Sequence, residues 1–387
     1  MERLKRAPRR RVSKRMRAVV AECRIMGKPS KIEEVVSMAS SLGYEVVGIV
    51  SQRRRAPHAS FCIGRGKMEE LKELVEGRMA ESVIFANGLS GSQAFKISRE
   101  LGGDIKVIDR NMLILELFKE RAMTKEAQLQ IQLARLRYTF SWGREYLRLE
   151  GILGEQVGWS GPGDYPFKEY ERAARRRISR LERALEAIER RKDALRARRR
   201  ELGFPTAVLT GYTQSGKTTF FNLVARESKS VGIGPFTTLS TFARRVEYRG
   251  EGGRSEFMLV DSIGFIEDMH PIILDAFHST LSEISNADLV LLFLDASEDP
   301  QTLSRKASYS DEILRRLGVR SPMIVCANKI DLLSERGLKK ALGLIEELLP
   351  GREIIPISAK LGGNVDLLLA RASSLLSAAE EMAVGGS

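Results

Sequence analysis

The sequence has few cysteines, histidines and aromatic residues, and it has no long apolar run. Its cysteines are Cys23, Cys62 and Cys326, without a CxxC pair or a histidine close behind any of them. This scarcity excludes a disulfide framework and a zinc knuckle, and it favours a reducing, cytoplasmic compartment. No stretch approaches the roughly 18 apolar residues of a membrane span, and the basic start lacks the apolar segment of an export signal. Secretion and membrane insertion are not expected.

The length and composition predict a globular chain with more than one domain. Domains of roughly 100 to 200 residues are usual, so 387 residues predict two or three of them. Hydrophobic residues make up 43% of the chain, charged residues 29% and aromatic residues 6%. This balance matches neither disordered nor collagen-like chains, and it predicts a soluble protein.

Positive charge is concentrated in the first half of the chain. The net charge is +13, but residues 1–200 contain 44 Lys and Arg against 26 Asp and Glu, while the remainder contains 19 against 24. A basic half predicts a polyanionic partner, because phosphate neutralisation with counterion release is the main sequence-independent source of nucleic-acid affinity. The alternative is a set of solvated helix faces.

The first 115 residues alternate short apolar runs with amphipathic stretches. Because strands that alternate with helices imply parallel crossovers, residues 1–115 are predicted to form a small parallel α/β domain behind a basic leader. The expected strands are 17–23, 45–50, 82–85 and 105–108, and the expected helices are 30–42, 67–78 and 90–101.

Two helices with complementary apolar stripes are expected in residues 116–200. Their spacing predicts an antiparallel helical hairpin, and the second helix is rich in arginine. Lys192 is the polar interruption of the second stripe. The stripes consist of Leu129, Leu133, Leu136 and Phe140, and of Ile178, Leu181, Leu185, Ile188 and Leu195.

The connection between these helices, residues 151–167, is rich in glycine and predicts a long loop. Eight of the chain's 25 aromatic residues fall between Tyr138 and Tyr170, interleaved with Arg and Lys. Such a segment favours stacking on unpaired RNA bases, with phosphates held alongside. The alternative interpretation packs some of these rings, Phe140 above all, into the hairpin.

Residues 201–378 carry the motifs of nucleotide chemistry. The apolar run 205–210 leads directly into a glycine-rich loop and a helix, which is the context of a P-loop. Backbone N–H groups would surround the α and β phosphates, Lys217 would reach the β and γ oxygens, and the Thr218 hydroxyl would ligate Mg²⁺. The predicted nucleotide-binding residues of this loop are Gly211, Tyr212, Thr213, Gln214, Ser215, Gly216, Lys217, Thr218 and Thr219.

Three further motifs predict the γ-phosphate and base contacts. Asp261 and Gly264 form a DxxG motif, which sets a carboxylate near Mg²⁺ and a glycine N–H toward the γ-phosphate. The Asp331 carboxylate only accepts hydrogen bonds, so it suits the N1–H and N2–H₂ donors of guanine. The NKxD and SAK motifs supply Asn328, Lys329, Asp331, Ser358, Ala359 and Lys360. The order of the motifs predicts a P-loop GTPase domain that binds GTP and GDP, with a tail at 379–387.

Phe265 follows Gly264, at the position where Ras-type GTPases carry the glutamine that orients the attacking water. A phenyl ring can neither accept nor donate the hydrogen bonds of that step. We therefore expect slow unaided hydrolysis, with the missing group supplied by another residue or by a partner.

Together these residues resemble one family, the HflX GTPases. The resemblance covers about residues 17–378 and implies an N-terminal HflX domain, a helical linker whose loop projects into the large ribosomal subunit, and a GTPase that binds ribosomes. Bacterial members split ribosomes, and we expect an archaeal-like member without the C-terminal extension of some bacterial ones. Residues 161–164 read GPGD where the family has GPGE, and Ser262 replaces the usual threonine. The resemblance rests on LVDSIGFIEDMHPIILDAFHSTLSEISNADLVLLFLDAS, GYTQSGKTT, FTTL, SFCIGRGKMEEL and DRNMLILELF.

Spacing and this resemblance assign the switch threonine to Thr238, in preference to Thr237 or Thr241. Catalysis is then expected at Lys217, Thr238 and Gly264, and Mg²⁺ ligation at Thr218, Thr238 and Asp261. The predicted function is a Mg²⁺-dependent GTPase that binds the large ribosomal subunit and its RNA as a GTP-controlled switch and splits or rescues ribosomes. We expect a monomer, partly ribosome-associated in the cytoplasm.

Two other interpretations stay open at this point. One is a passive RNA-binding factor that silences or assembles ribosomes and in which the nucleotide is structural. The other adds a second nucleotide site at residues 64–67, a glycine-basic turn ahead of a helix.

Overall fold

A computed structural model describes residues 16–122, 124–154, 164–201, 204–225, 242–250, 253–262, 264–266 and 270–384. The predicted basic leader therefore falls outside the described residues. Contacts within the chain define two compact units, Met1–Ile114 with Trp142–Gln156, and Leu115–Ser141 with Val157–Ser387. The domain boundaries expected at 115, 200 and 378 stay predictions.

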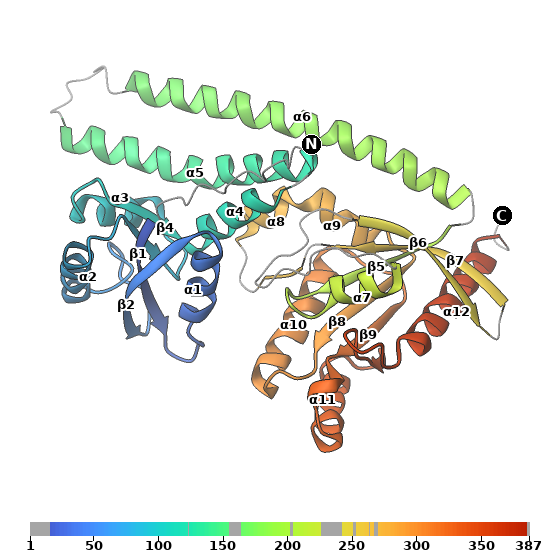
Figure 1. The fold of residues 1–387 in the computed structure, drawn as a ribbon. Coiled ribbons are helices and arrows are strands. Elements are labelled where there is room, and N and C mark those ends of the chain that lie inside the picture. The colour runs from blue at the N-terminus through green and yellow to red at the C-terminus, as the bar shows by residue number, and fades with distance from the viewer. Residues whose placement is uncertain are drawn as a thin grey trace, which may run out of the picture. The chain divides into compact units, whose positions relative to one another are not determined.

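The first unit contains a four-stranded parallel sheet, which confirms the α/β class predicted for it. The central strand β1 (Met16–Ile25) is buried from Ala18 to Cys23, as expected of a strand covered on both faces. The order is β2-β1-β3-β4 (Figure 1), with β2 at Tyr44–Arg54, β3 at Ser82–Phe85 and β4 at Lys106–Asp109. The crossover helices are α1 (Ile32–Ser41), α2 (Arg65–Gly77) and α3 (Gly91–Glu100).

Two buried carboxylates fix the loops of this sheet. Glu22, on β1, accepts hydrogen bonds from the Ser30 hydroxyl at 2.9 Å and from the Lys31 N–H at 2.6 Å. Asp109, at the end of β4, accepts from the N–H groups of Leu89 and Met112 at 3.0 and 2.8 Å. Because buried carboxylates are stable only when hydrogen-bonded, these contacts define where the crossovers begin.

A helical middle region follows, with α4 (Arg110–Arg121), α5 (Lys125–Gly154) and α6 (Asp164–Glu201). Phe140 stacks on Tyr170 with ring centroids 6.1 Å apart, and Lys192 Nζ lies 2.8 Å from Glu126 Oε1. The partner of Glu126 on α6 is residue 192, whereas the partner of Phe140, later on α5, is residue 170, earlier on α6. This order confirms that the two helices of the hairpin are antiparallel. The stacked pair also confirms that Phe140 packs inside the hairpin.

The predicted loop at 151–167 is shorter than expected. Gly151–Gly154 end α5, and α6 begins at Asp164. An isolated glycine costs a helix only about 1 kcal/mol, and Pro166 is tolerated in a first turn, where its missing N–H has no partner to lose. Trp159 and the rest of 155–163 lie outside the described residues. RNA contact by this segment stays a prediction.

The hairpin stripes are only partly buried. Leu133 and Leu181 are buried, but Leu195 is 56% exposed, so the predicted stripe ends before it. Two aromatic residues of the same window are packing residues: Tyr138 is buried, and Trp142 packs against the core of the first unit. The buried Tyr138 ring is therefore not available for stacking on RNA bases.

The far end of α6 is joined to helix α9 (His278–Ser285) by an ion-pair cluster. Arg196, 14% exposed, lies 3.1 Å from Glu283 Oε1 and 3.2 Å from Glu189 Oε1, and it donates to the Ser282 hydroxyl. Lys192 pairs with Glu283 at 3.6 Å as well as with Glu126. Lys192, the polar residue that interrupts the second stripe, is therefore part of the ion-pair cluster between α6 and α9.

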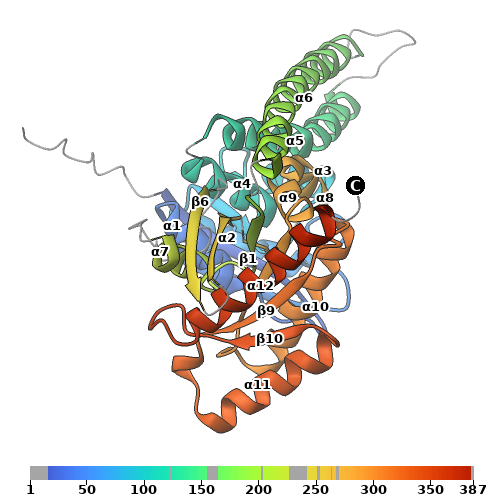
Figure 2. The same ribbon diagram turned by 90° about the vertical axis from the view of Figure 1, so that its right-hand side faces the viewer.

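The second unit contains a six-stranded mixed sheet in the order β10-β9-β8-β5-β7-β6, in which only β6 runs antiparallel. Figure 2 shows β9 and β10 side by side at one end of this order. The predicted run 205–210 forms β5 (Thr206–Gly211), and the other three motifs lie at the ends of β7 (Gly253–Asp261), β9 (Met323–Asn328) and β10 (Glu353–Pro356). Strands β6 (Phe242–Gly250) and β8 (Leu289–Asp295) complete the sheet.

Helices cover this sheet and enclose its core. Phe220 and Phe221 of α7 (Lys217–Ala225) and Leu368 of α12 (Val365–Val384) are fully buried with Phe257 and Leu259 of β7. The remaining helices are α8 (Pro271–Ala276), α10 (Pro300–Arg316) and α11 (Glu335–Leu348), with a short η1 (Ile330–Leu332). Among the helices of the described residues, none combines the length and apolarity needed to cross a membrane.

Replacing Arg196 with alanine should lower the free energy of unfolding by about 1–3 kcal/mol, because Glu189 and Glu283 lose the cation between them in a partly buried setting. Arg198→Ala, on an exposed position of the same helix, is the matched control and should change stability little. Urea unfolding followed by circular dichroism measures both. Equal midpoints would show that the junction adds no stability.

Candidate nucleotide site

The predicted motifs meet at one edge of the second sheet. The P-loop follows β5, the DxxG motif follows β7, the NKxD motif follows β9 and the SAK motif follows β10. These four strands run in the same direction, with β8 between β5 and β9. Carboxyl ends of parallel strands lie at a common edge, which is where open α/β sheets bind ligands.

Two glycines allow the P-loop to lie against the sheet. Gly211 has φ +128°, and a Cβ atom there would lie 2.2 Å from the Phe293 carbonyl oxygen. Gly216 has φ +99°, and its Cβ would lie 2.0 Å from Asn328 Nδ2. Both the backbone angle and the lack of space therefore require glycine. The loop also holds Gln214 at φ +66°.

Lys217 lies at the start of α7 with its ammonium group inside the loop. Its Nζ donates to the carbonyl oxygens of Gly211 at 2.9 Å and Tyr212 at 2.6 Å. Burial lowers the pKa of Lys217 to about 8, while the nearby Asp261 carboxylate opposes the shift. The P-loop therefore holds the buried Lys217 ammonium group by hydrogen bonds to two of the loop's own carbonyl oxygens.

Thr218 and Asp261 bring two oxygen donors together. The Thr218 hydroxyl donates to Asp261 Oδ2 at 3.1 Å, and both residues are buried. A hydroxyl beside a carboxylate fits Mg²⁺, which prefers oxygen ligands and usually takes one or two carboxylates plus phosphate oxygens. Within the described residues no cluster of three or more His, Cys, Asp or Glu could hold a metal ion.

The DxxG segment is hydrogen-bonded to the P-loop. The Phe265 N–H donates to the Gly211 carbonyl at 2.9 Å, and the Thr213 N–H donates to the Phe265 carbonyl at 3.1 Å. A Cβ on Gly264 would lie 2.9 Å from Thr213 N. The Phe265 ring is 3% exposed and lines a small apolar cavity with Leu274, Phe277 and Leu281. It is therefore a packing residue, which agrees with the absence of a water-orienting group at this position.

Asn328 connects the base side to the phosphate side. Its Nδ2 donates to the Ser215 carbonyl at 2.7 Å, and its Oδ1 accepts from the Ala359 N–H at 2.9 Å. Asp331 Oδ1 accepts from the Ser358 hydroxyl at 2.6 Å. The structure thus brings the NKxD and SAK motifs together, with Asp331 oriented by a neutral donor.

Two residues near the site carry no motif and were not identified from the sequence. Asp295, at the end of β8, forms an ion pair with Lys329, whose backbone is left-handed at φ +67°. Lys306 Nζ lies 5.4 Å from the centre of the Tyr212 ring. A polar residue at the carboxyl end of an apolar strand was the available signal for Asp295.

The other predicted site residues are less constrained. Thr219 is partly buried behind Thr218, and Lys360 is exposed. Thr238 lies outside the described residues, as do Thr237 and Thr241. In the first unit, the Gly64 N–H donates to Gln52 Oε1 at 2.7 Å at the start of α2. A second nucleotide site there stays a prediction.

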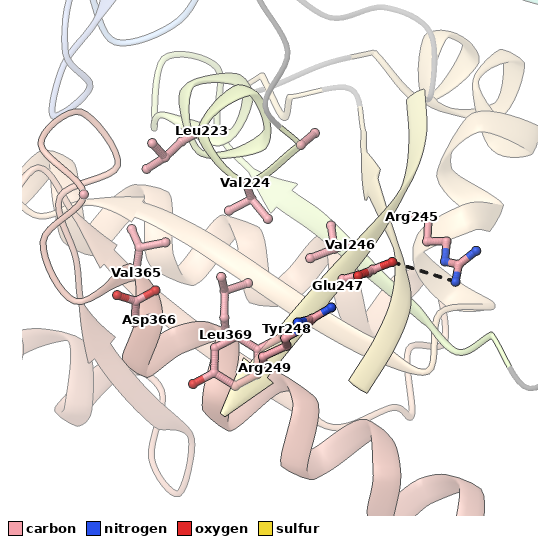
Figure 3. A pocket seen from close by; sticks show the side chains of 12 residues that line it. Leu223, Val224, Arg245, Val246, Glu247, Tyr248, Arg249, Val365, Asp366 and Leu369 are labelled. Carbon is pink, nitrogen blue, oxygen red and sulfur yellow. Dashed lines mark ion pairs between the residues drawn. The ribbon is translucent and has the colours of Figure 1, made fainter. Parts of the chain in front are cut away.

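A groove of about 970 Å³ lies elsewhere on the second unit, between α7, β6 and α12 (Figure 3). Its apolar wall includes Leu223, Val224, Val365 and Leu369, and Arg245 pairs with Glu247 at 4.0 Å beside it. No residue of the four motifs lines it. It is therefore separate from the nucleotide site.

Comparison with known proteins assigns the family. The pattern of "GTP-binding GTPase N-terminal" matches residues 29–119, that of "GTP-binding GTPase Middle Region" matches 121–199, and that of "50S ribosome-binding GTPase" matches 206–329. The GTPase HflX of Thermococcus kodakarensis is 39% identical over 341 residues, which are 87% of this chain and 75% of that protein. The chain belongs to the HflX family of GTPases. The GTPase HflX of Hyperthermus butylicus is 37% identical over 356 residues, 89% of this chain and 92% of that protein.

A solved structure shares the architecture of this HflX family chain. The crystal structure of the SsGBP and GDP complex is 29% identical, with a TM-score of 0.53, over 94% of this chain and 99% of that one. SsGBP holds GDP in that complex. The family expected from the sequence is therefore confirmed, together with its α/β fold class, its helical middle region and its GTPase domain.

Lys217 predicts a pH dependence of GDP affinity. Because burial lowers its pKa to about 8, the free protein holds the ammonium form below that pH and loses it above. Bound phosphate favours the charged form, so affinity should be full below pH 8 and fall by up to about tenfold per pH unit above it. Calorimetry between pH 6.5 and 9.5 measures this. Lys217→Arg, which keeps its charge over this range, is the control. If the GDP affinity of both proteins fell in parallel with pH, Lys217 would not be the group that contacts the phosphates.

Asp331→Asn should shift the base preference from guanine toward xanthine, because the amide replaces one acceptor with a donor. Competition between GDP and xanthosine diphosphate measures the preference. Ser358→Ala is the matched control, since it removes the hydroxyl bonded to Asp331 and keeps the carboxylate. It should weaken binding without changing the preferred base. A variant at 331 that still prefers GDP would exclude this residue from base selection.

Proposed function

We propose that this protein is a Mg²⁺-dependent GTPase that binds the large ribosomal subunit and acts there as a GTP-controlled switch. Splitting or rescue of ribosomes is the outcome we propose for that switch, and a monomer in the cytoplasm, partly bound to ribosomes, is its proposed state. Family membership, the match to the 50S ribosome-binding GTPase pattern and the GDP complex of SsGBP support this proposal.

The proposed roles follow the geometry of the motifs. Lys217 would hold the β and γ oxygens, and the Gly264 N–H would face the γ-phosphate. Thr218 and Asp261, with Thr238, would hold Mg²⁺, which when bound would neutralise charge on the phosphate oxygens. The remaining P-loop residues would bind the phosphates through the backbone, and the NKxD and SAK residues would bind guanine.

One observation carries the switch: the segment after the DxxG motif contacts the helical middle region. The His270 and Tyr138 rings meet edge to face with centroids 5.1 Å apart, and Phe277 meets Phe118 in the same way at 5.1 Å. Further along, Glu283 pairs with Lys192 and Arg196 on α6. The segment that follows the DxxG motif therefore contacts α4 through Phe277, α5 through His270 and α6 through Glu283. A change at the γ-phosphate that moved this segment would act on all three helices.

We propose that these contacts can break and form again between two states of the protein. His270 caps α8, because its Nδ1 accepts from the Ile272 N–H at 3.2 Å, and burial lowers its pKa. The neutral ring can therefore act both as acceptor for the cap and as a partner for Tyr138. Edge-to-face pairs contribute about 0.5–1.5 kcal/mol beyond burial, which is small enough to exchange between states.

Affinity for ribosomal RNA would come from the arginines of α6. Exposed positions along this helix include Arg172, Arg175, Arg176, Arg180, Arg183, Arg190, Arg191 and Arg198. Some are offset by acids on the same helix, as Arg175 is by Glu171 at 2.6 Å. The rest would neutralise phosphates, so binding should weaken steeply with salt.

The test is GTP hydrolysis with and without isolated large ribosomal subunits. Because Phe265 is packed away, the free protein should be slow, and subunits should accelerate it severalfold or more. Tyr138→Leu should keep the slow basal rate but lose most of the acceleration, since it removes the ring facing His270. Tyr170→Leu, which alters the Phe140 pair in the hairpin, is the matched control and should be accelerated normally. Fast hydrolysis alone, with no effect of subunits, would favour the passive RNA-binding alternative.

A further inference from the structure

A second concave site lies among the helices of the middle region. A cavity of about 580 Å³ is bounded by the end of α4, one face of α5 and the start of α6, all within the second unit. This volume falls in the range usual for ligand sites. The lining residues are Lys119, Ala122, Gln128, Ile131, Gln132, Arg135, Leu136, Thr139 and Arg177.

The charge around this cavity is of one sign. Lys119, Arg135 and Arg177 line it, and no lining residue is acidic. Within the described residues, none of these three side chains forms an ion pair or a side-chain hydrogen bond. Other bases of the same helices are paired, since Arg137 lies 2.6 Å from Glu182 and Lys192 lies 2.8 Å from Glu126. The cavity therefore contains three cations from three helices without an acidic partner among the described residues.

The floor of the cavity is apolar, with polar groups at its side. Ile131 and Ala122 are buried there, next to Leu136. Gln128 Nε2 donates to the Ala122 carbonyl at 3.1 Å, which leaves its oxygen as an acceptor, and the exposed Gln132 amide has no partner in the part of the chain that the structure describes. Cations, an apolar surface and amides in one cavity are the groups that contact phosphates, base faces and base edges respectively.

We propose that this cavity binds a segment of single-stranded RNA, with phosphates at Lys119, Arg135 and Arg177 and a base against Ile131 and Leu136. The cations come from three different helices, so a strand that follows the cavity can meet them in succession. An acidic peptide would satisfy the charge, but its Asp and Glu side chains offer no apolar face to Ile131 and Leu136. Only the source of the RNA, the ribosome, rests on the proposed function.

The site is adjacent to the contacts of the switch. Lys119 follows Phe118, which meets Phe277, and Thr139 follows Tyr138, which meets His270. Successive helical residues point about 100° apart, so α4 and α5 present one face to the RNA site and another to the switch segment. RNA in the cavity would hold the same helices that the nucleotide state moves, and this would couple the two sites.

Binding of a fluorescein-labelled single-stranded RNA of about twelve nucleotides, followed by anisotropy across a salt series, tests the site. Arg135→Glu with Arg177→Glu should weaken binding at low salt by at least about tenfold and reduce the salt slope by about 1.4, which is about 0.7 for each lost contact to a single-strand phosphate. Arg336→Glu with Arg352→Glu makes the same charge change on exposed positions of the second unit that lie outside both the cavity and α6. That control should lose much less affinity.

Unchanged GDP affinity in both double variants verifies folding, and Arg135→Gln with Arg177→Gln repeats the test with a smaller charge change. Equal losses in the cavity and control variants would overturn the proposal in favour of general electrostatic attraction. Competition by AMP or by a polyglutamate peptide as effective as unlabelled RNA would also overturn it. If the cavity variant alone loses RNA binding but large subunits fail to stimulate wild-type hydrolysis, the RNA site stands and the proposed function falls.

Discussion

The geometry of the candidate nucleotide site depends on the two hydrogen bonds that the Asn328 side chain makes. It donates to Ser215 in the P-loop and accepts from Ala359 in the SAK segment, and it is itself the first residue of the NKxD motif. Three loops far apart in sequence therefore share one buried amide. Leaving such a group unsatisfied costs about 1–3 kcal/mol, so a displacement of any one loop is opposed by the other two.

The P-loop lies so close to β8 and to Asn328 that two of its positions accept only glycine. Gly216 faces the Asn328 amide and Gly211 faces a carbonyl of β8, each at a distance that no side chain could occupy. Lys217 then uses two carbonyl groups of the loop as partners. The sheet edge thus determines the backbone of the loop, and the loop determines where the cation lies. Chemistry at this site depends on packing between strands more than on any single polar contact.

Much of this arrangement could be predicted from the sequence because each motif is local. A glycine-rich loop, a DxxG and an NKxD each follow an apolar strand, and parallel strands bring their carboxyl ends together without further information. The parallel sheet of the first unit and the helical hairpin were readable from periodicity for the same reason. The P-loop lysine and threonine, Asp261, Asn328 and Asp331 were selected in this way, and the structure brings them to the same edge of the sheet.

Features that depend on distant contacts could not be predicted. Arg196 and Glu283 are 87 positions apart, and nothing in the local pattern of either indicates the pairing. Asp295 supports Lys329 from a neighbouring strand and has no motif of its own. The ends of α5 and α6 were misplaced because glycine and proline lower helix propensity by amounts that the helical context overcame. Leu195 fits the heptad spacing yet is exposed, since periodicity reports a face but not whether another element covers it.

The length of α6 has a mechanical consequence. The helix is continuous from Asp164 to Glu201 and is attached to α9 near its end, at Arg196. At 1.5 Å per residue, the portion from Asp164 to Arg196 is about 48 Å long. A rod of that length pivoting by about ten degrees at the attached end would carry its free end through about 8 Å, which exceeds the 5.4 Å pitch of a helical turn. A small rotation beside the GTPase motifs would therefore become a displacement several times larger at the Asp164 end of α6, if α6 moved together with α5 as one rigid hairpin.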